Sequence, residues 1–171
     1  LTPEYSSMLR TFPFNRISMG IQTFQDSTLK LLQRRHTAEQ AIRAFQNCRT
    51  AGFRNISIDL MYGLPGETLA SWKEDLKQAL ALHPEHISAY HLIYEEGTTL
   101  WQLREQHKLE EADEDLSVSL FGTLIDSLTA AGYEHYEISN FCLPGFHSRH
   151  NSRSTPCPLP ARTTSWRASS P

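Results

Sequence analysis

The chain alternates between two hydrophobic periods, and this alternation limits its fold more than any other feature. Segments with apolar residues at every second position, as in a β-strand, are separated by segments with the three- to four-residue spacing of an amphipathic helix. The expected strands are 16–22, 55–60, 87–93 and 133–138, and the expected helices are 2–11, 37–51, 69–80 and 111–131. This α-β-α-β-α-β-α-β order predicts an α/β fold with parallel strands and right-handed crossovers, either a doubly wound sheet or a barrel.

Capping and turn residues support these boundaries. Thr37 and Gln40 form a capping-box pattern at the start of the second helix, and Gly52 and Gly132 are placed to end two helices. The segment 63–66, Gly-Leu-Pro-Gly, enforces a turn after the second strand. Its backbone amides could cradle an anion, although a plain strand-to-helix turn explains the same residues.

Composition and charge exclude several classes of protein. The 171 residues carry 16 Lys and Arg against 19 Asp and Glu, so there is no basic field to hold a nucleic acid. No apolar run reaches the roughly 18 residues that span a bilayer, and no signal peptide begins the chain. We therefore expect a cytoplasmic protein with neither nucleic-acid partner nor transmembrane segment. Neither GxGxxG nor GxxxxGK[ST] follows a strand, which argues against dinucleotide and P-loop sites.

The cysteines do not form a recognisable pattern. Cys48, Cys142 and Cys157 are odd in number and far apart, which argues against a disulfide framework and against a CxxC metal site. His147 and His150 lie near Cys142 and could bind a metal or heme iron. With no carboxylate or second cysteine at a fixed spacing, we do not expect a zinc site there.

The composition changes from Ser139 onward, where Ser, Thr, Pro and Arg dominate. This segment predicts no regular element. A disordered extension, a truncation or an out-of-frame stretch would each explain it, and we favour the last two.

Two polar residues near the ends of expected strands are candidates for ligand binding. Asp59 lies within an apolar strand, where an unpaired carboxylate costs several kcal/mol, roughly. A structural hydrogen bond to a loop amide explains it about as well as a ligand does. Gln22 ends the first strand, where an amide commonly satisfies the backbone. Arg34 stands in an Arg-Arg-His run that is more typical of a solvated basic surface.

Two long motifs, residues 15–24 (NRISMGIQTF) and 58–66 (IDLMYGLPG), closely resemble radical S-adenosylmethionine proteins of the oxygen-independent coproporphyrinogen III oxidase group. The resemblance extends through residues 91–95 and 132–134 to about Asn151. Within that group, residues 136–141 and 144–151 are more similar to the HemW heme chaperone branch than to the oxidase.

The resemblance implies a partial radical SAM (β/α)6 TIM-like barrel with S-adenosylmethionine (SAM) across the carboxyl ends of its strands. Gln22, Arg34 and Asp59 match positions that contact this cofactor, and Ile93 matches one that contacts it mainly through backbone. A guanidinium suits the methionine carboxylate, and a carboxylate or an amide suits the ammonium or the ribose hydroxyls.

His150-Asn151 matches the start of a His-Asn-x-x-Tyr-Trp segment associated with heme binding, so His150 is the implied heme residue. Here the next residues are Ser152 to Thr155, without the aromatic pair. The family's CxxxCxxC loop, which binds a [4Fe-4S] cluster, is also absent from these 171 residues. The resemblance thus places the cluster ligands outside this chain, and the polypeptide alone is expected to be inactive.

The resemblance divides the chain into three parts: residues 1–138 as later barrel, 139–153 as the start of a C-terminal HemW-like region, and 154–171 as an irregular tail. It implies a heme chaperone that binds SAM, a [4Fe-4S] cluster and heme or porphyrin and passes heme to acceptor proteins. The alternatives are an oxidase that decarboxylates coproporphyrinogen III, a non-catalytic heme- or metal-binding α/β module that uses His147 and His150, and an unrelated barrel enzyme.

Overall fold

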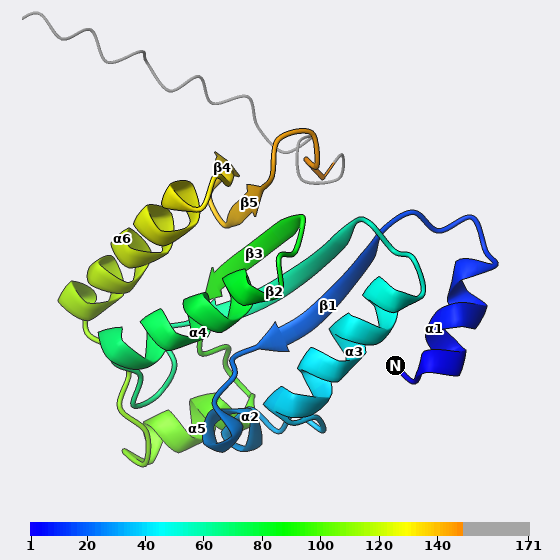
Figure 1. Ribbon diagram of the computed structural model, residues 1–171. Coiled ribbons are helices and arrows are strands. Elements are labelled where there is room, and N and C mark those ends of the chain that lie inside the picture. Colours follow the sequence, from blue (N-terminus) through cyan, green and yellow to red (C-terminus); the bar gives the residue numbers. More distant parts are fainter. Residues whose placement is uncertain (149–171) are drawn as a thin grey trace, which may run out of the picture.

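A five-stranded mixed sheet forms the centre of the computed structural model, which describes residues 1–148 (Figure 1). The strand order is β1-β2-β3-β5-β4. The strands are β1 (Ile17–Gln22), β2 (Ile56–Tyr62), β3 (His86–His91), β4 (Glu134–Glu137) and β5 (Asn140–Cys142). The helices are α1 (Pro3–Arg10), α2 (Asp26–Leu31), α3 (Ala38–Thr50), α4 (Leu69–Ala81), α5 (Thr99–Glu105) and α6 (Glu114–Ala130). No helix among the described residues is both long and apolar enough to span a membrane.

The first three strands confirm the predicted parallel sheet. β1 pairs with β2 and β2 with β3, both in parallel, with α3 and α4 as the long crossover helices. The predicted capping box of Thr37 and Gln40 is present, and Gly52 and Gly132 end their helices with positive φ angles. Helices α2 and α5, of six and seven residues, are too short to leave a clear hydrophobic period and were not predicted.

The last part of the sheet differs from the expected parallel order. β4 pairs antiparallel with β5, and β5 pairs antiparallel with β3, so β5 lies between them. Only Ile138 and Ser139 separate β4 from β5, and so short a connection can form a hairpin but not a crossover. The expectation that no regular element follows Ser139 was therefore wrong. Residues 140–142 form the strand β5, and all three are buried.

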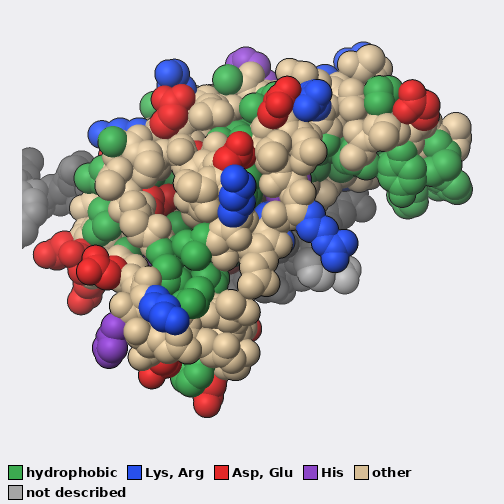
Figure 2. All heavy atoms as spheres, turned by 90° about the horizontal axis from the view of Figure 1, so that it is seen from below, with side chains coloured by type: hydrophobic (Ala, Val, Ile, Leu, Met, Phe, Trp, Pro, Cys, Tyr) green, Lys and Arg blue, Asp and Glu red, His purple; other side chains and the backbone are tan. Residues whose placement is uncertain are grey.

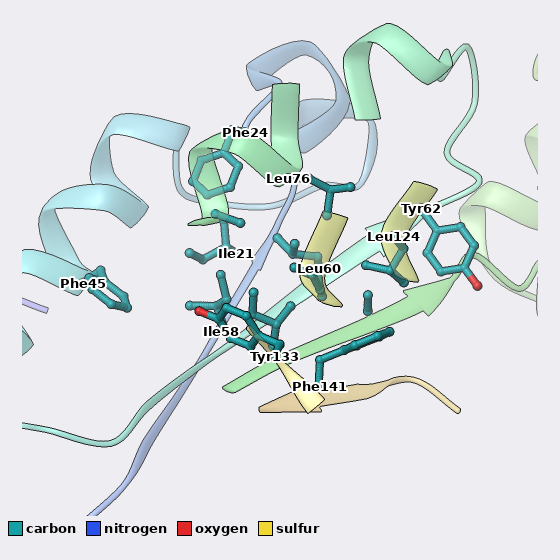
Figure 3. Packing of buried hydrophobic residues seen from close by; sticks show 14 of the residues in the cluster. Ile21, Phe24, Phe45, Ile58, Leu60, Tyr62, Leu76, Leu124, Tyr133 and Phe141 are labelled. Carbon is teal, nitrogen blue, oxygen red and sulfur yellow. The ribbon is translucent and has the colours of Figure 1, made fainter. Parts of the chain in front are cut away.

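The hydrophobic core lies between one face of the sheet and the long helices (Figure 3). Every second residue of β2 points into it, from Ile56 through Ile58 and Leu60 to Tyr62. Trp72 is completely buried among them. The helices contribute Ala41, Phe45 and Cys48 from α3, Leu76 and Ala79 from α4, and Leu120, Leu124 and Leu128 from α6. Period-two strands and amphipathic helices thus bury one common apolar layer.

Apolar side chains remain exposed at the α1 end of the molecule. They gather at the right of Figure 2, where Figure 1 places α1, and Phe12 and Phe14 contact each other with ring centroids 5.8 Å apart. The exposed apolar residues of this end are Leu1, Tyr5, Met8, Phe12 and Phe14. A groove of about 660 Å³ lies close by, between α1, α3 and the edge strand β1.

Candidate functional site

The second face of the sheet is polar, because the residues that alternate with the core residues carry hydroxyl, carboxyl, amide and imidazole groups. Strand register places them in two rows that run across the sheet. The Asp59 row consists of Gly20, Asp59, Ser88, Asn140 and Glu137. The His86 row consists of Ser18, Ser57, His86, Cys142 and Glu134. We call the surface formed by these two rows the polar face.

Asp59 is the central ionisable group of the polar face. It lies in the middle of β2 rather than at the strand end, since β2 continues to Tyr62. Burial raises the pKa of its carboxyl, while hydrogen bonds from Ser18 and Ser88 and the charge of Arg16 oppose that rise. The Ser18 hydroxyl lies 3.4 Å from each carboxylate oxygen. These are long hydrogen bonds, so the carboxylate retains acceptor capacity for a ligand.

Gln22 lies beside Asp59 on the polar face. The register shifts between Gly20 and Gln22, and Gln22 has a positive φ of 74°. This backbone turn brings its carboxamide over Gly20, the residue directly opposite Asp59. A Cβ atom at Gly20 would lie 2.7 Å from the Gln22 Nε2 atom. A larger residue at position 20 would therefore displace the Gln22 carboxamide from this position.

Arg34 and Ile93 are not part of this arrangement. Arg34 is exposed in the segment after α2, and no hydrogen bond or ion pair within residues 1–148 joins its side chain to Gln22 or Asp59. Ile93 follows β3 and is 75% exposed. The structure thus brings together two of the three side chains that the resemblance assigns to SAM, and the cation that acts on Asp59 is Arg16. His150 lies outside the described residues.

The buried middle of the His86 row is part of a chain of hydrogen bonds. The Ser57 hydroxyl lies 2.9 Å from His86 Nδ1, and His86 Nε2 lies 2.7 Å from the Tyr136 hydroxyl. Burial lowers the pKa of His86 to about 4. The imidazole is therefore neutral at physiological pH and links β2, β3 and β4 as a structural group.

The loop after β2 does not offer its amides to an anion, as one interpretation of Gly-Leu-Pro-Gly had it. The Glu67 carboxylate accepts hydrogen bonds from the Gly63 amide at 2.6 Å and from the Leu64 amide at 3.3 Å. Gly63 has a φ of 71°, and a Cβ there would clash with the His91 ring. Glu67 thus occupies the cradle from within the chain.

Glu67 is expected to make stability depend on pH. Burial raises the pKa of its carboxyl from 4.5 to about 7. Between pH 4.5 and about 7 the folded state therefore binds more protons than the unfolded state, and the free energy of unfolding falls as the pH rises through this range. Between pH 5 and 8, Glu67 is expected to lower the free energy of unfolding, measured with urea, by on the order of 2 kcal/mol, and the Glu67→Gln variant is expected to lack this decrease. The exposed control Glu74→Gln keeps the slope; an unchanged slope in Glu67→Gln would contradict this prediction.

Asp75 is a residue that the sequence interpretation missed. It lies on α4, is 1% exposed, and receives hydrogen bonds from the Thr23 hydroxyl at 2.5 Å, the Phe24 amide at 3.1 Å and the Gln25 carboxamide at 3.2 Å. It therefore fixes the loop that follows Gln22. The available signal was a carboxylate on the buried face of a predicted helix, between Trp72 and Leu76.

Comparisons with known proteins agree with this architecture. Residues 1–79 match the model of the Radical SAM superfamily. Heme chaperone HemW of Lactococcus lactis subsp. lactis is 40% identical over 151 residues, which cover 88% of this chain and 40% of that protein. Residues 1–79 are thus similar to the radical SAM superfamily. The resemblance inferred from residues 15–24 and 58–66 is thereby confirmed.

Further relatives extend the comparison. The mouse Radical S-adenosyl methionine domain-containing protein 1, mitochondrial, is 36% identical over 137 residues, which cover 80% of this chain and 31% of that protein. The structure of Escherichia coli coproporphyrinogen III oxidase (HemN), described as a radical SAM enzyme, matches with a TM-score of 0.73 and 26% identity over 85% of this chain and 33% of that one. The chain thus has the predicted α/β class and spans about 40% or less of the length of these proteins.

Proposed function

We propose that this chain is part of a heme chaperone that binds SAM, a [4Fe-4S] cluster and heme, and that it acts in the cytoplasm on heme-acceptor proteins. The observation that carries the proposal is the 40% identity to Heme chaperone HemW over 88% of the chain. The polar face supports it, because a carboxylate and an amide lie in adjacent registers on the face of the sheet opposite the long helices.

The residues of the polar face fit a zwitterionic nucleoside cofactor. Asp59 would accept hydrogen bonds from the SAM ammonium or from ribose hydroxyls, and Gln22 can both donate and accept. Arg34 would reach the methionine carboxylate from the surface, and Ile93 would contribute backbone. The cluster, with ligands outside this chain, supplies the electron that cleaves the sulfonium. His150 is the proposed heme residue, and the division at residues 138 and 153 stays a prediction.

A SAM titration of the chain tests the cofactor site. Isothermal calorimetry is expected to show saturable binding that Asp59→Ala weakens about tenfold or more, since the carboxylate loses a charge-assisted hydrogen bond. The exposed Asp126→Ala variant is the matched control and retains the affinity. Equal affinity of the two variants would remove Asp59 from the site, and Gln22→Ala tests its neighbour in the same way.

A coproporphyrinogen III oxidase is the second candidate, favoured by the structural match to HemN. The two functions differ in their products. We expect a longer protein that includes the cysteine loop to transfer heme to an apo-acceptor under anaerobic conditions, without forming protoporphyrinogen. Protoporphyrinogen formation without heme transfer would establish the oxidase instead. Heme titration of His150→Ala, followed by its Soret band, tests the heme residue separately.

A further inference from the structure

Three potential metal ligands meet at the end of the His86 row, away from the proposed SAM residues. Glu134 of β4 lies directly opposite Cys142 of β5 in the antiparallel register. His147 follows in the next segment, and its Nε2 atom lies 3.1 Å from a Glu134 carboxylate oxygen. A carboxylate oxygen, the thiol sulfur and an imidazole nitrogen all lie within 4.8 Å of one another.

We propose that Glu134, Cys142 and His147 bind a zinc-class divalent transition-metal ion. A tetrahedral zinc ion with bonds of roughly 2.0 to 2.3 Å holds its ligand atoms roughly 3.3 to 3.7 Å apart. The carboxylate and imidazole are already that close, so the site needs a contraction of at most about 1.5 Å between the widest pair. Two of the ligands are mobile enough for this, because the His147 and Glu134 side chains are 43% and 48% exposed.

The chemistry of the three ligands selects the kind of metal. Thiolate and imidazole favour zinc, cobalt and similar ions, whereas calcium and magnesium prefer sites made entirely of oxygen. With three protein ligands, a fourth position stays open for water.

Neighbouring residues hold the ligands in place, as they do around known metal sites. The Tyr136 ring packs edge-on against His147 with centroids 4.7 Å apart, and the Tyr136 hydroxyl accepts a hydrogen bond from the Ser148 amide. The Phe146 amide donates to the Leu143 carbonyl at 3.0 Å, which closes a turn directly after Cys142. These contacts involve both the hairpin and the segment 143–148, so a bound ion would fasten that segment to the sheet.

The sequence alone argued against this site, because no carboxylate stands at a fixed spacing from Cys142 and His147. Glu134 is eight residues upstream of Cys142, and only the hairpin register brings the two together. The expected parallel arrangement of the last strand hid this contact. Glu134 therefore supplies the carboxylate that the sequence spacing did not show.

Cobalt titration tests the proposal with a readout independent of radical chemistry. The full chain carrying Cys157→Ser, which removes the cysteine outside the described residues, is freed of metal and titrated with Co²⁺. We expect a near-ultraviolet sulfur-to-cobalt charge-transfer band that saturates at one equivalent and disappears when Zn²⁺ is added. The further change Cys48→Ser, at the other buried cysteine, leaves the band intact.

Ligand variants decide the assignment. Cys142→Ser abolishes the band, while Glu134→Gln and His147→Gln weaken Co²⁺ binding at least about tenfold. His107→Gln is the exposed control and has no effect. If Cys142→Ser does not fold by circular dichroism, His147→Gln decides, because that position is exposed. No band in the parent chain, or undiminished binding in His147→Gln, would overturn the proposal.

Discussion

Replacing Asp75 with alanine is expected to lower the free energy of unfolding by about 3 kcal/mol. The substitution removes the acceptor for three donors, the Thr23 hydroxyl, the Phe24 amide and the Gln25 carboxamide. A buried donor without a partner costs about 1–3 kcal/mol. Relief of the desolvated carboxylate, whose pKa burial raises, offsets part of that loss. Urea unfolding at constant pH measures the difference.

Two variants separate the hydrogen bonds of Asp75 from other effects. Glu74→Ala, at the exposed neighbouring position, is expected to change stability by less than about 0.5 kcal/mol. Asp75→Asn keeps the size and one oxygen acceptor, so we expect an intermediate loss. A loss below about 1 kcal/mol in Asp75→Ala would show that the loop finds other partners. If Gln22 binds SAM, Asp75→Ala also weakens SAM binding, because the loop that follows Gln22 is released.

Replacing Trp72 with alanine is expected to cost about 3–5 kcal/mol. The indole is completely buried between the sheet and the helices, and its ring lies 5.6 Å from that of Tyr62. Its Nε1 donates to the Leu120 carbonyl at 3.0 Å, which joins α4 to α6. Alanine therefore leaves a cavity and also breaks the polar contact between the two helices.

Trp72→Phe separates the packing of the indole from its hydrogen bond, and Trp101→Ala serves as a comparison at a partly buried position. Phenylalanine keeps most of the packing and loses the indole donor, so we expect a cost of about 1–2 kcal/mol. Trp101 on α5 is only partly buried, and its replacement by alanine is expected to cost about 1–2 kcal/mol. Thermal unfolding of the three variants ranks them, and equal losses for Trp72→Ala and Trp101→Ala would contradict the central place of Trp72.

The parallel part of the sheet could be predicted because its information is local. Ile56, Ile58 and Leu60 show the strand period, and the Thr37 capping box marks a helix start that the structure reproduces. These patterns depend on neighbouring residues along the chain. The type of the first three strands and their parallel pairing therefore followed from the sequence.

The antiparallel hairpin and the contacts of the site could not be predicted in the same way. Whether β4 lies next to β3 depends on β5, a three-residue strand too short to show a period. The partners of Asp75 are about fifty residues away along the chain, and Cys142 meets Glu134 only through register. Such long-range pairings depend on tertiary packing, which a single sequence does not reveal.

The position of β5 also sets an order on folding during synthesis. β4 has no ladder of its own to β3, so it joins the sheet only through a strand that leaves the ribosome after it. A chain that has emerged from the ribosome as far as Ser139 holds three paired strands and a fourth that is still unattached. Residues 140–142 therefore join β4 to the sheet, and the β3 edge stays exposed to other chains until they emerge.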